Sequence, residues 1–477
     1  MAKEKIAVLG GGCAAMAAVF ALTDRKDWRQ KYEITVYQPG WRLGGKGASG
    51  RNARAGERIQ EHGLHVWSGF YENAFWLMRE CYAELNRPTT HPLATAFAAF
   101  QPHHYAGLSR RVEGEWFYWK GYLPHDTGLP GDFIDPASGE PKAGVRSPWE
   151  MMSELILWAT QYLQTTSNTA KVRAPDLTEE KNWLIRTFIW GRQRKARNWL
   201  ERIAQWIENI VVLIASYRVL LAFRAASRYH DRADLRPQSR KVHLHTDAPY
   251  QRLARRLECL QRWSGMKLRG LATAQSDEQS FYVMIDLAMA MMIGMLKDGV
   301  IAHGFDVIDD KDLREWLRFH GAHPTSVGSS TVGSAYSYLF SFEDGEPLNP
   351  DKQRLAAGVA LRLMMRLLLC SRGGSFWKMR AGMGDVVFAP IYEVLKKRGV
   401  NFRFFHRVLE IKTDDGKQVD EILIGRQADL KNGEPGYAPL KDIKGIPCWP
   451  AEPDYDQLVQ GDELRQKYRD TPCDLDS

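Results

Sequence analysis

Two glycine-containing turns near the N-terminus constrain this chain more than any other feature of its sequence. The first lies in the run IAVLGGGCAA at 6–15, which predicts an apolar strand, a tight turn and the start of a helix. Gly10 lets the backbone turn, Gly12 leaves room for a pyrophosphate, and Ala15 lets the helix pack close to the strand. A second strand predicted at 33–38 completes a βαβ unit. Because a helix N-terminus attracts phosphate, the pattern predicts dinucleotide binding, with a purely structural turn as the alternative.

The second turn, RLGGK at 42–46, comes shortly after the second predicted strand. A nicotinamide dehydrogenase usually continues here into another helix, with Asp or Glu at the end of the strand. This chain has Gln38 at that position. A neutral amide can still accept a hydrogen bond from a ribose hydroxyl, but it gives up roughly 1 kcal/mol of the charge-assisted bond. The sequence therefore departs from the nicotinamide pattern.

Three segments of the chain resemble the flavin-binding amine oxidase and phytoene desaturase superfamily. The first is the spacing V-x-x-x-x-x-R-x-G-G-[RK] at 36–46, and the third is GMGD at 382–385, followed by VLEI at 408–411. The second, RIQEHGLHVWSGFYENAFWLMREC at 58–81, is similar to the plant and cyanobacterial phytoene and ζ-carotene desaturase pattern E-x-G-L-H-x-F-x-G-x-Y-x-N. Its matching positions are Glu61, Gly63, Leu64, His65, Trp67, Gly69, Tyr71 and Asn73.

The resemblance implies FAD as the cofactor, bound by an α/β, Rossmann-like FAD-binding domain of the GR2-type flavoprotein class. It also implies that the Gly-Gly turn approaches the FAD pyrophosphate, that a cation in that turn neutralises it, and that the backbone of Val408 contacts the adenine. The cofactor-binding residues expected on this basis are Gly10, Gly12, Cys13, Ala14, Ala15, Gln38, Arg42, Leu43, Gly44, Gly45, Lys46, Arg58, Gly63, Leu64 and Val408.

The turn EHGLH at 61–65 is expected to lie near the isoalloxazine, if the geometry of the family holds. The titratable groups around it are the candidate catalytic residues Arg58, Glu61, His62 and His65. His62 could move a proton near neutral pH, although a structural histidine is the alternative. We expect no metal site, because His62 and His65 have no third ligand in register.

At 477 residues the chain exceeds one ordinary hydrophobic core, so two domains are expected. Because the resemblance is confined to the two ends, the FAD-binding domain is expected to be discontinuous, formed by 1–95 and 371–477. Residues 96–370 would form an inserted substrate domain, largely helical with a small sheet.

Near its C-terminus the chain departs from the resembling family. That family closes the flavin site with a Gly-Asp segment followed by an apolar helix of small residues, whereas Gly461-Asp462 begins a charged helix here. Three explanations stay open: a partner subunit supplies the closing segment, the chain is a truncated form, or it binds flavin weakly.

Positive charge is concentrated between 181 and 270, where 20 Lys/Arg face 6 Asp/Glu, a net charge of +14 in a chain of +8. Apolar residues at helical spacing predict one or two long amphipathic helices over 181–230. Such helices suit an anionic membrane surface, or a solvated basic face over an ordinary core; no nucleic-acid fold signature accompanies the charge.

No uncharged apolar stretch approaches the ~18–20 residues that span a bilayer. The N-terminus enters the first strand at once and leaves no room for a signal peptide. The six cysteines show no C-x-x-C spacing, as expected of reduced thiols. We therefore expect a cytoplasmic protein, with two alternatives open for 181–270: a solvated basic face, or peripheral contact with a membrane surface.

Together these features predict an FAD-dependent oxidoreductase, desaturase-like, that removes a hydride from a small apolar, isoprenoid-like substrate. A flavin amine oxidase is the alternative enzyme, because the same fold carries that chemistry. A non-catalytic half-site subunit that needs a partner chain is the alternative of another class. Substrate identity, electron acceptor, catalytic base and oligomeric state stay open.

Overall fold

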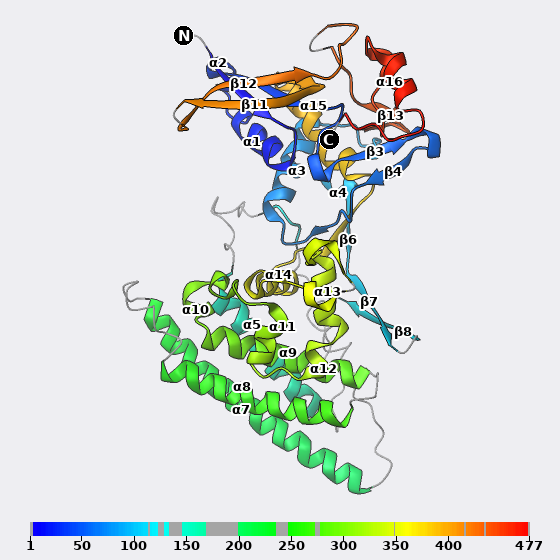
Figure 1. The fold of residues 1–477 in the computed structure, drawn as a ribbon. Coiled ribbons are helices and arrows are strands. Elements are labelled where there is room, and N and C mark those ends of the chain that lie inside the picture. Colours follow the sequence, from blue (N-terminus) through cyan, green and yellow to red (C-terminus); the bar gives the residue numbers. More distant parts are fainter. Residues whose placement is uncertain are drawn as a thin grey trace. The chain divides into compact units, whose positions relative to one another are not determined.

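The protein forms two compact units, each described by itself below (Figure 1). A computed structural model describes residues 3–112, 115–122, 128–132, 146–167, 199–234, 247–271, 277–347, 349–414, 416–433 and 436–475. Unit 1 comprises Met1–His103, Pro130–Asp132 and Phe376–Ser477, and unit 2 comprises His104–Leu129 and Phe133–Ser375. The boundaries at 103 and 376 differ by a few residues from those expected at 95 and 371.

Unit 1 is built on a three-stranded parallel sheet. Its strands are β1 (Glu4–Leu9), β2 (Tyr32–Gln38) and β10 (Asn401–Phe404), in the order β1-β2-β10. Ile6 lies opposite Ile34, and Asn401 lies opposite Thr35. Both strands of the predicted βαβ unit are therefore confirmed, and a strand from the far end of the sequence joins the same sheet.

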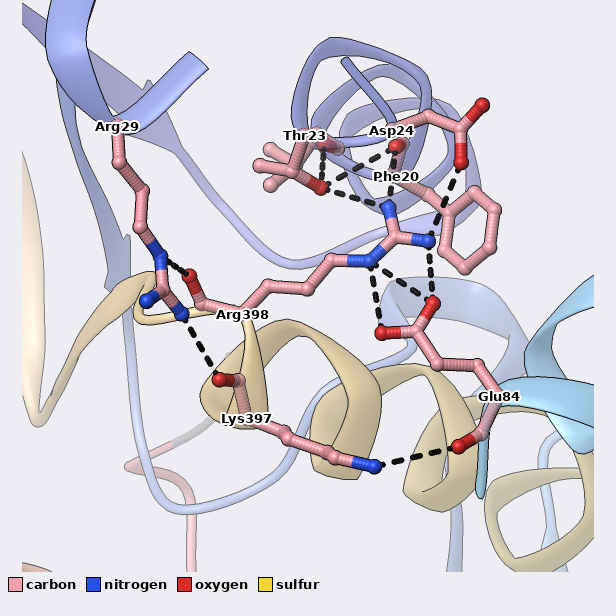
Figure 2. Close-up of polar contacts among 8 residues, drawn as sticks. Phe20, Thr23, Asp24, Arg29, Glu84, Lys397 and Arg398 are labelled. Carbon is pink, nitrogen blue, oxygen red and sulfur yellow. Dashed lines mark hydrogen bonds and ion pairs between the residues drawn. The ribbon is translucent and has the colours of Figure 1, made fainter. Parts of the chain in front are cut away.

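Three helices of unit 1 meet at one arginine. They are α1 (Cys13–Thr23), α3 (Glu72–Leu85) and α15 (Ala389–Lys397). Figure 2 shows Arg398, directly after α15, with its Nε donating to both carboxylate oxygens of Glu84 at 3.1 and 3.0 Å. Its Nη1 donates to the Phe20 carbonyl and to Thr23 Oγ1, both at 3.0 Å. The side chain is mostly buried, so its fork of donors fixes the end of α1 against α3.

Small two- and three-stranded sheets surround this core. They are β3 (Ser49–Asn52) with β4 (Arg58–Glu61), β5 (Trp67–Ser68) with β9 (Phe376–Met379) and β6 (Phe100–His103), β11 (His406–Asp414) with β12 (Gln418–Arg426), and β13 (Lys441–Ile443) with β14 (Ile446–Cys448). The short helices are α2 (Trp28–Lys31), α4 (Ala96–Ala99) and α16 (Gly461–Lys467). Because β6 pairs with β9, unit 1 extends to residue 103.

Unit 2 is mostly helical. Among its described residues the helices are α5 (Pro148–Ser167), α7 (Trp199–Asp234), α8 (Ala248–Gly270), α9 (Asp277–Lys297), α10 (Val300–His303), α11 (Leu313–Phe319), α12 (Pro324–Val327), α13 (Ser330–Tyr338) and α14 (Ala357–Leu369). One hairpin accompanies them, β7 (Tyr105–Val112) with β8 (Glu115–Tyr122). Within the Met-rich run of α9, Met289, Met292 and Met295 are buried in the core.

A half-buried carboxylate joins the end of α9 to α11. Asp298 Oδ2 accepts hydrogen bonds from Trp316 Nε1 at 2.7 Å and Lys311 Nζ at 3.1 Å, and lies 3.0 Å from His320 Nε2. Burial alone would raise the pKa of Asp298, but these donors outweigh it and hold the pKa well below its usual range. The carboxylate therefore stays charged and stabilises this corner of unit 2 near neutral pH.

The long basic segment forms a helix, as predicted, where the structure describes it. Residues 199–234 form one continuous helix, α7, and 181–198 lie outside the described residues. Contrary to expectation, two stretches are long and apolar enough to cross a membrane by length and composition, Ile210–Arg232 and Gln279–Lys297. The prediction counted only uncharged stretches, although an apolar stretch that contains one or two charges can also be long enough to cross a membrane. The second stretch is 78% buried inside the protein, as expected of a core helix.

Candidate nucleotide-binding site

The two glycine-containing turns of unit 1 lie side by side. The N–H of Gly44 donates to the carbonyl of Gly11 at 2.9 Å, and Gly12 and Gly44 pair as an isolated parallel bridge. The N–H of Gly10 donates to the carbonyl of Tyr37 at 2.8 Å, which fixes the first turn against the end of β2. The turns at 10–12 and 44–45 thus form one backbone surface at the carboxyl ends of β1 and β2, where open α/β sheets bind ligands.

The space around the first turn is open at two of its three glycines. A Cβ atom placed at Gly10 or Gly12 meets no heavy atom within 4 Å, whereas one placed at Gly11 would clash with Leu43. Gly10 has φ of +89°, which an L side chain rarely adopts. Leu43 is fully buried and fills the inner side of the turn. The outer side is therefore free for another molecule to approach the backbone.

Helix α1 begins at this open surface. Gly12 precedes its first residue, and no side chain caps the helix start. Cys13 and Ala14 are exposed, and the first turn contains no acidic residue. Lys46, in the 3₁₀ turn η1 (Gly45–Gly47), is also exposed. Unpaired N–H groups at a helix N-terminus attract phosphate, so the residues present fit a pyrophosphate.

Gln38, a predicted cofactor contact, is held inside the protein. Its side chain is 5% exposed, and its Oε1 accepts a hydrogen bond from the N–H of Gly11 at 2.6 Å. Its Nε2 donates to the carbonyl of Pro39 at 2.8 Å. The amide group therefore holds the first turn in place from within the protein. An amide can do this because it offers both a donor and an acceptor, which a carboxylate does not.

The EHGLH turn divides into a fixed and an exposed part. Glu61 Oε1 accepts the N–H of Met383 at 2.8 Å, and Glu61 Oε2 lies 2.9 Å from His65 Nδ1. The other candidates of this turn and of β4, Arg58, His62, Gly63 and Leu64, are exposed, and 64% of Leu64 is accessible. We therefore assign Glu61 a positioning role and retain His62 as the candidate that a ligand can reach.

The glycines of GMGD allow a close approach to β3. The N–H of Gly384 donates to Ser49 Oγ at 2.7 Å. A Cβ at Gly382 would lie 2.6 Å from this Oγ, and one at Gly384 would lie 2.7 Å from it. Gly384 begins the π-helical turn η9 (Gly384–Phe388), which continues into α15. Helix distortions of this kind are frequent at functional sites.

Sequence reasoning missed a buried ion pair beside this motif. Arg51 of β3 donates to Asp385 Oδ2 through Nη2 at 2.7 Å and Nε at 3.0 Å. Burial raises the pKa of Asp385, an effect that Arg51 opposes. Burial, together with the Asp385 charge, raises the pKa of the neighbouring Cys448 thiol to about 12. A lone carboxylate within the apolar run GMGDVVFAP was the available signal, because buried carboxylates need a partner.

A cavity of about 520 Å³ gathers three of the predicted residues, Arg42, Glu61 and His62. Its other lining residues are Asn52, Arg54, Gln60, Ala451, Glu452, Arg469, Asp470, Thr471, Pro472 and Cys473. The guanidinium of Arg42 also stacks on the ring of Trp41, 5.2 Å from its centroid. The C-terminal segment thus contributes one wall of a cavity next to the EHGLH turn.

Val408 lies on β11, opposite Ile424 of β12, and is half-buried. The start of this hairpin is joined to the end of β2, because the N–H of Phe405 donates to the carbonyl of Gly40 at 2.8 Å. The hairpin therefore leaves the sheet next to the strand that precedes the second turn. Within the part of the chain that the structure describes, no group of three or more His, Cys, Asp or Glu side chains could hold a metal ion.

Comparisons with known proteins agree with this geometry in the N-terminal region. Residues 8–81 match the NAD(P)-binding Rossmann-like domain family. The chain is 39% identical over 84 residues to the chloroplastic/chromoplastic zeta-carotene desaturases of Capsicum annuum and Arabidopsis thaliana, and 38% identical to that of Solanum lycopersicum. The matched stretch is 18% of this chain and 13–14% of each relative. The Rossmann-like domain and the resemblance to carotene desaturases are confirmed for this region.

Proposed function

We propose that this protein is an FAD-dependent oxidoreductase of the desaturase type. The observation that carries the proposal is the pairing of Gly12 with Gly44, which joins two turns beside the uncapped start of α1. A nicotinamide site needs only the first of these turns, whereas a second glycine turn suits a cofactor held along a longer backbone surface. The 38–39% identity to zeta-carotene desaturases over this region supports the flavin over the nicotinamide.

The residues that would hold the cofactor follow from the open surface. The N–H groups of the first turn and of the start of α1 would bind the pyrophosphate, and Lys46 would supply positive charge. Bound FAD would supply hydride transfer, which protein side chains cannot perform. His62 would hold or release the accompanying proton, because it is exposed and lines the cavity beside the EHGLH turn.

Unit 1 would be the FAD-binding domain and unit 2 the inserted substrate domain. The proposed substrate is small and apolar, and the resemblance to carotene desaturases is its main support. The Met-rich run does not add to this support, since its methionines fill the core of unit 2.

The edge of the sheet favours a second candidate, a half-site protein completed by another segment. Strand β1 lies at the edge of a parallel sheet, and its residues are half-buried or exposed. Helix α1 is apolar on all sides, yet Ala14, Ala18 and Leu22 are exposed. Parallel sheets and helices of such composition are usually covered on both faces. A further strand beside β1 would cover these residues.

Purification of the chain and its absorption spectrum test the proposal. A bound oxidised flavin absorbs at about 380 and about 450 nm, a general property of the cofactor. The proposal predicts these bands, either directly or after incubation with FAD, and loss of both in Gly12→Val. Saturable binding of NADP⁺ but not FAD would overturn the flavin assignment. Flavin bands that appear only when a second polypeptide is co-expressed would establish the half-site candidate.

A further inference from the structure

Helix α7 of unit 2 has two sharply different faces. One face packs into the core through Val212, Val219 and Phe223. The opposite face exposes Val211, Ile214, Tyr217 and Leu221, each between 46% and 56% accessible. These positions follow at intervals of three and four residues, so the four side chains form one apolar stripe along the helix.

The same face of α7 also carries exposed arginines. Arg218 lies within the apolar stripe, and Arg224 and Arg228 continue its spacing toward the C-terminal end. None of the three has a carboxylate within salt-bridge distance among the described residues. A solvated helix face usually carries carboxylates as well as cations, and on the exposed face of α7 between 210 and 232 only Asp231 is acidic.

The neighbouring helix α8 extends this basic surface. Helices α7 and α8 pack against one another and lie side by side in Figure 1. Arg252, Arg255, Arg262 and Arg269 of α8 are exposed along its outer face. Opposite them, Leu253, Leu257, Leu260 and Leu268 are buried. Each helix therefore buries one apolar face in unit 2 and presents arginines on the opposite face.

We propose that the exposed faces of α7 and α8 dock on the surface of an anionic lipid bilayer. The apolar stripe of Val211, Ile214, Tyr217 and Leu221 would enter the interface, and the arginines would contact lipid phosphates. Uncompensated positive charge complements an anionic leaflet, and apolar residues on the same helix face distinguish a membrane from a nucleic acid, which is bound by charge and polar contacts. The proposal is independent of the redox assignment.

The helix lies on the membrane and does not cross it. By length and composition, residues 210–232 are apolar enough to span a bilayer. However, Val212, Val219 and Phe223 are held in the core of unit 2, and spanning would expose them to lipid and leave the core unfilled. An amphipathic helix with one face already buried is placed to bind in the interface plane.

Co-sedimentation of the full chain with vesicles tests the docking. We expect binding to phosphatidylcholine vesicles that contain phosphatidylglycerol, and at least tenfold weaker binding to phosphatidylcholine alone or at high salt, because surface attraction is screened. Substitution of Arg218, Arg224 and Arg228 by Gln should weaken binding to the anionic vesicles at least tenfold. Substitution of Val211, Ile214 and Leu221 by Gln should weaken it by a similar factor.

Matched variants in unit 1 control for net charge and general hydrophobicity. R407Q/K417Q/K441Q removes the same charge from exposed positions, and I411Q/V419Q/L423Q removes exposed apolar residues from the β11–β12 hairpin. Both should bind vesicles as the wild type does. All substituted positions are exposed, so circular dichroism should show unchanged helix content.

Four results would overturn the proposal. The first is a folded wild-type protein that does not sediment with anionic vesicles at low salt. The second is equal loss of binding in the control variants. The third is displacement of the protein from vesicles by duplex DNA, together with equal DNA affinity of the wild type and the apolar-stripe variant. This result would assign the surface to nucleic acid. Retention on membranes after high-salt and carbonate washes would overturn surface docking in favour of spanning.

Discussion

At the turns of unit 1 single glycines decide the geometry, whereas in α7 and α8 of unit 2 the geometry follows from a repeating pattern. Gly10 and Gly44 have positive φ, a Cβ at Gly44 would clash with Ala48, and Gly12 leaves open space at the start of α1. In α7 several apolar residues pack together into the core of unit 2, and another apolar residue of similar size at the same helical interval could replace any one of them. The comparison teaches that one substitution can abolish the function of the turns, while the helical unit should lose stability in small steps.

The largest effect is expected from Gly12→Val, which should impair cofactor binding without changing the stability of the fold. Its φ of −75° is accessible to any residue, and a Cβ there meets no atom. Gly12→Val should therefore leave stability unchanged, yet its side chain would occupy the place of the pyrophosphate. We expect FAD binding to weaken about 1,000-fold, or about 4 kcal/mol, by titration calorimetry. Gly270→Val, also in open space, is the control; reduced helix content in Gly12→Val would break the argument.

Arg398→Ala tests whether one side chain of unit 1 can control the stability of the fold rather than cofactor binding. Arg398→Ala leaves Glu84 and the end of α1 without their donor, and we expect a loss of about 3 kcal/mol. Faster hydrogen exchange in α1 and α3, followed by mass spectrometry, would report it. Arg29 lies beside it in Figure 2 and bonds carbonyls at the surface, so Arg29→Ala should cost under about 1 kcal/mol. Equal effects of the two variants would contradict the account.

Gly384→Ala tests how much the close packing around a glycine contributes to the stability of unit 1. A Cβ there would lie 2.7 Å from Ser49 Oγ and 3.1 Å from the Trp449 ring. Gly384→Ala should destabilise unit 1 by about 2 kcal/mol through overpacking, measured by urea unfolding. Gly63→Ala meets nothing within 4 Å and should be neutral. A neutral Gly384→Ala would show that β3 moves aside freely.

Asp298 should give the smallest effect, and one that depends on pH. Its pKa is lower in the folded protein than in the unfolded chain, so its contribution is complete above the unfolded pKa of about 3.9 and is lost as the pH falls toward the folded value. Asp298→Asn should lower the free energy of unfolding by roughly 1.5 kcal/mol at pH 7. At a pH low enough to protonate Asp298 in the folded protein, the substitution should leave it unchanged. Thermal unfolding from pH 7 downward measures this, with exposed Asp310→Asn as control. A constant difference across that range would exclude the carboxylate as its cause.

The sequence predicted the parts of unit 1 whose spacing is itself the structural requirement. The strands at 4–9 and 32–38 and the glycines between them were predictable because few folds accommodate that order. The inward rotation of Gln38 was not, because the sequence does not show toward which partner a side chain turns. The pairing of Arg51 with Asp385 was not either, since 334 residues separate them and only the fold brings them together.

In unit 2 the periodic pattern predicted helix over 181–230, and α7 confirms it at 199–230. Arg218 ended the uncharged apolar stretch in the sequence, yet it lies within α7 at an exposed position. The same pattern could not show which apolar residues stay exposed. That depends on the positions of α5 and α8, which contact one side of α7.

The central claim is that the two turns bind one diphosphate, and competition for FAD by ADP and AMP tests it most directly. The account predicts that ADP displaces FAD from the wild-type chain far better than AMP does, because only ADP retains the diphosphate that the paired turns would hold. It also predicts that Gly12→Val abolishes this difference. Equal competition by ADP and AMP, or FAD binding by Gly12→Val equal to that of the wild type, would contradict it.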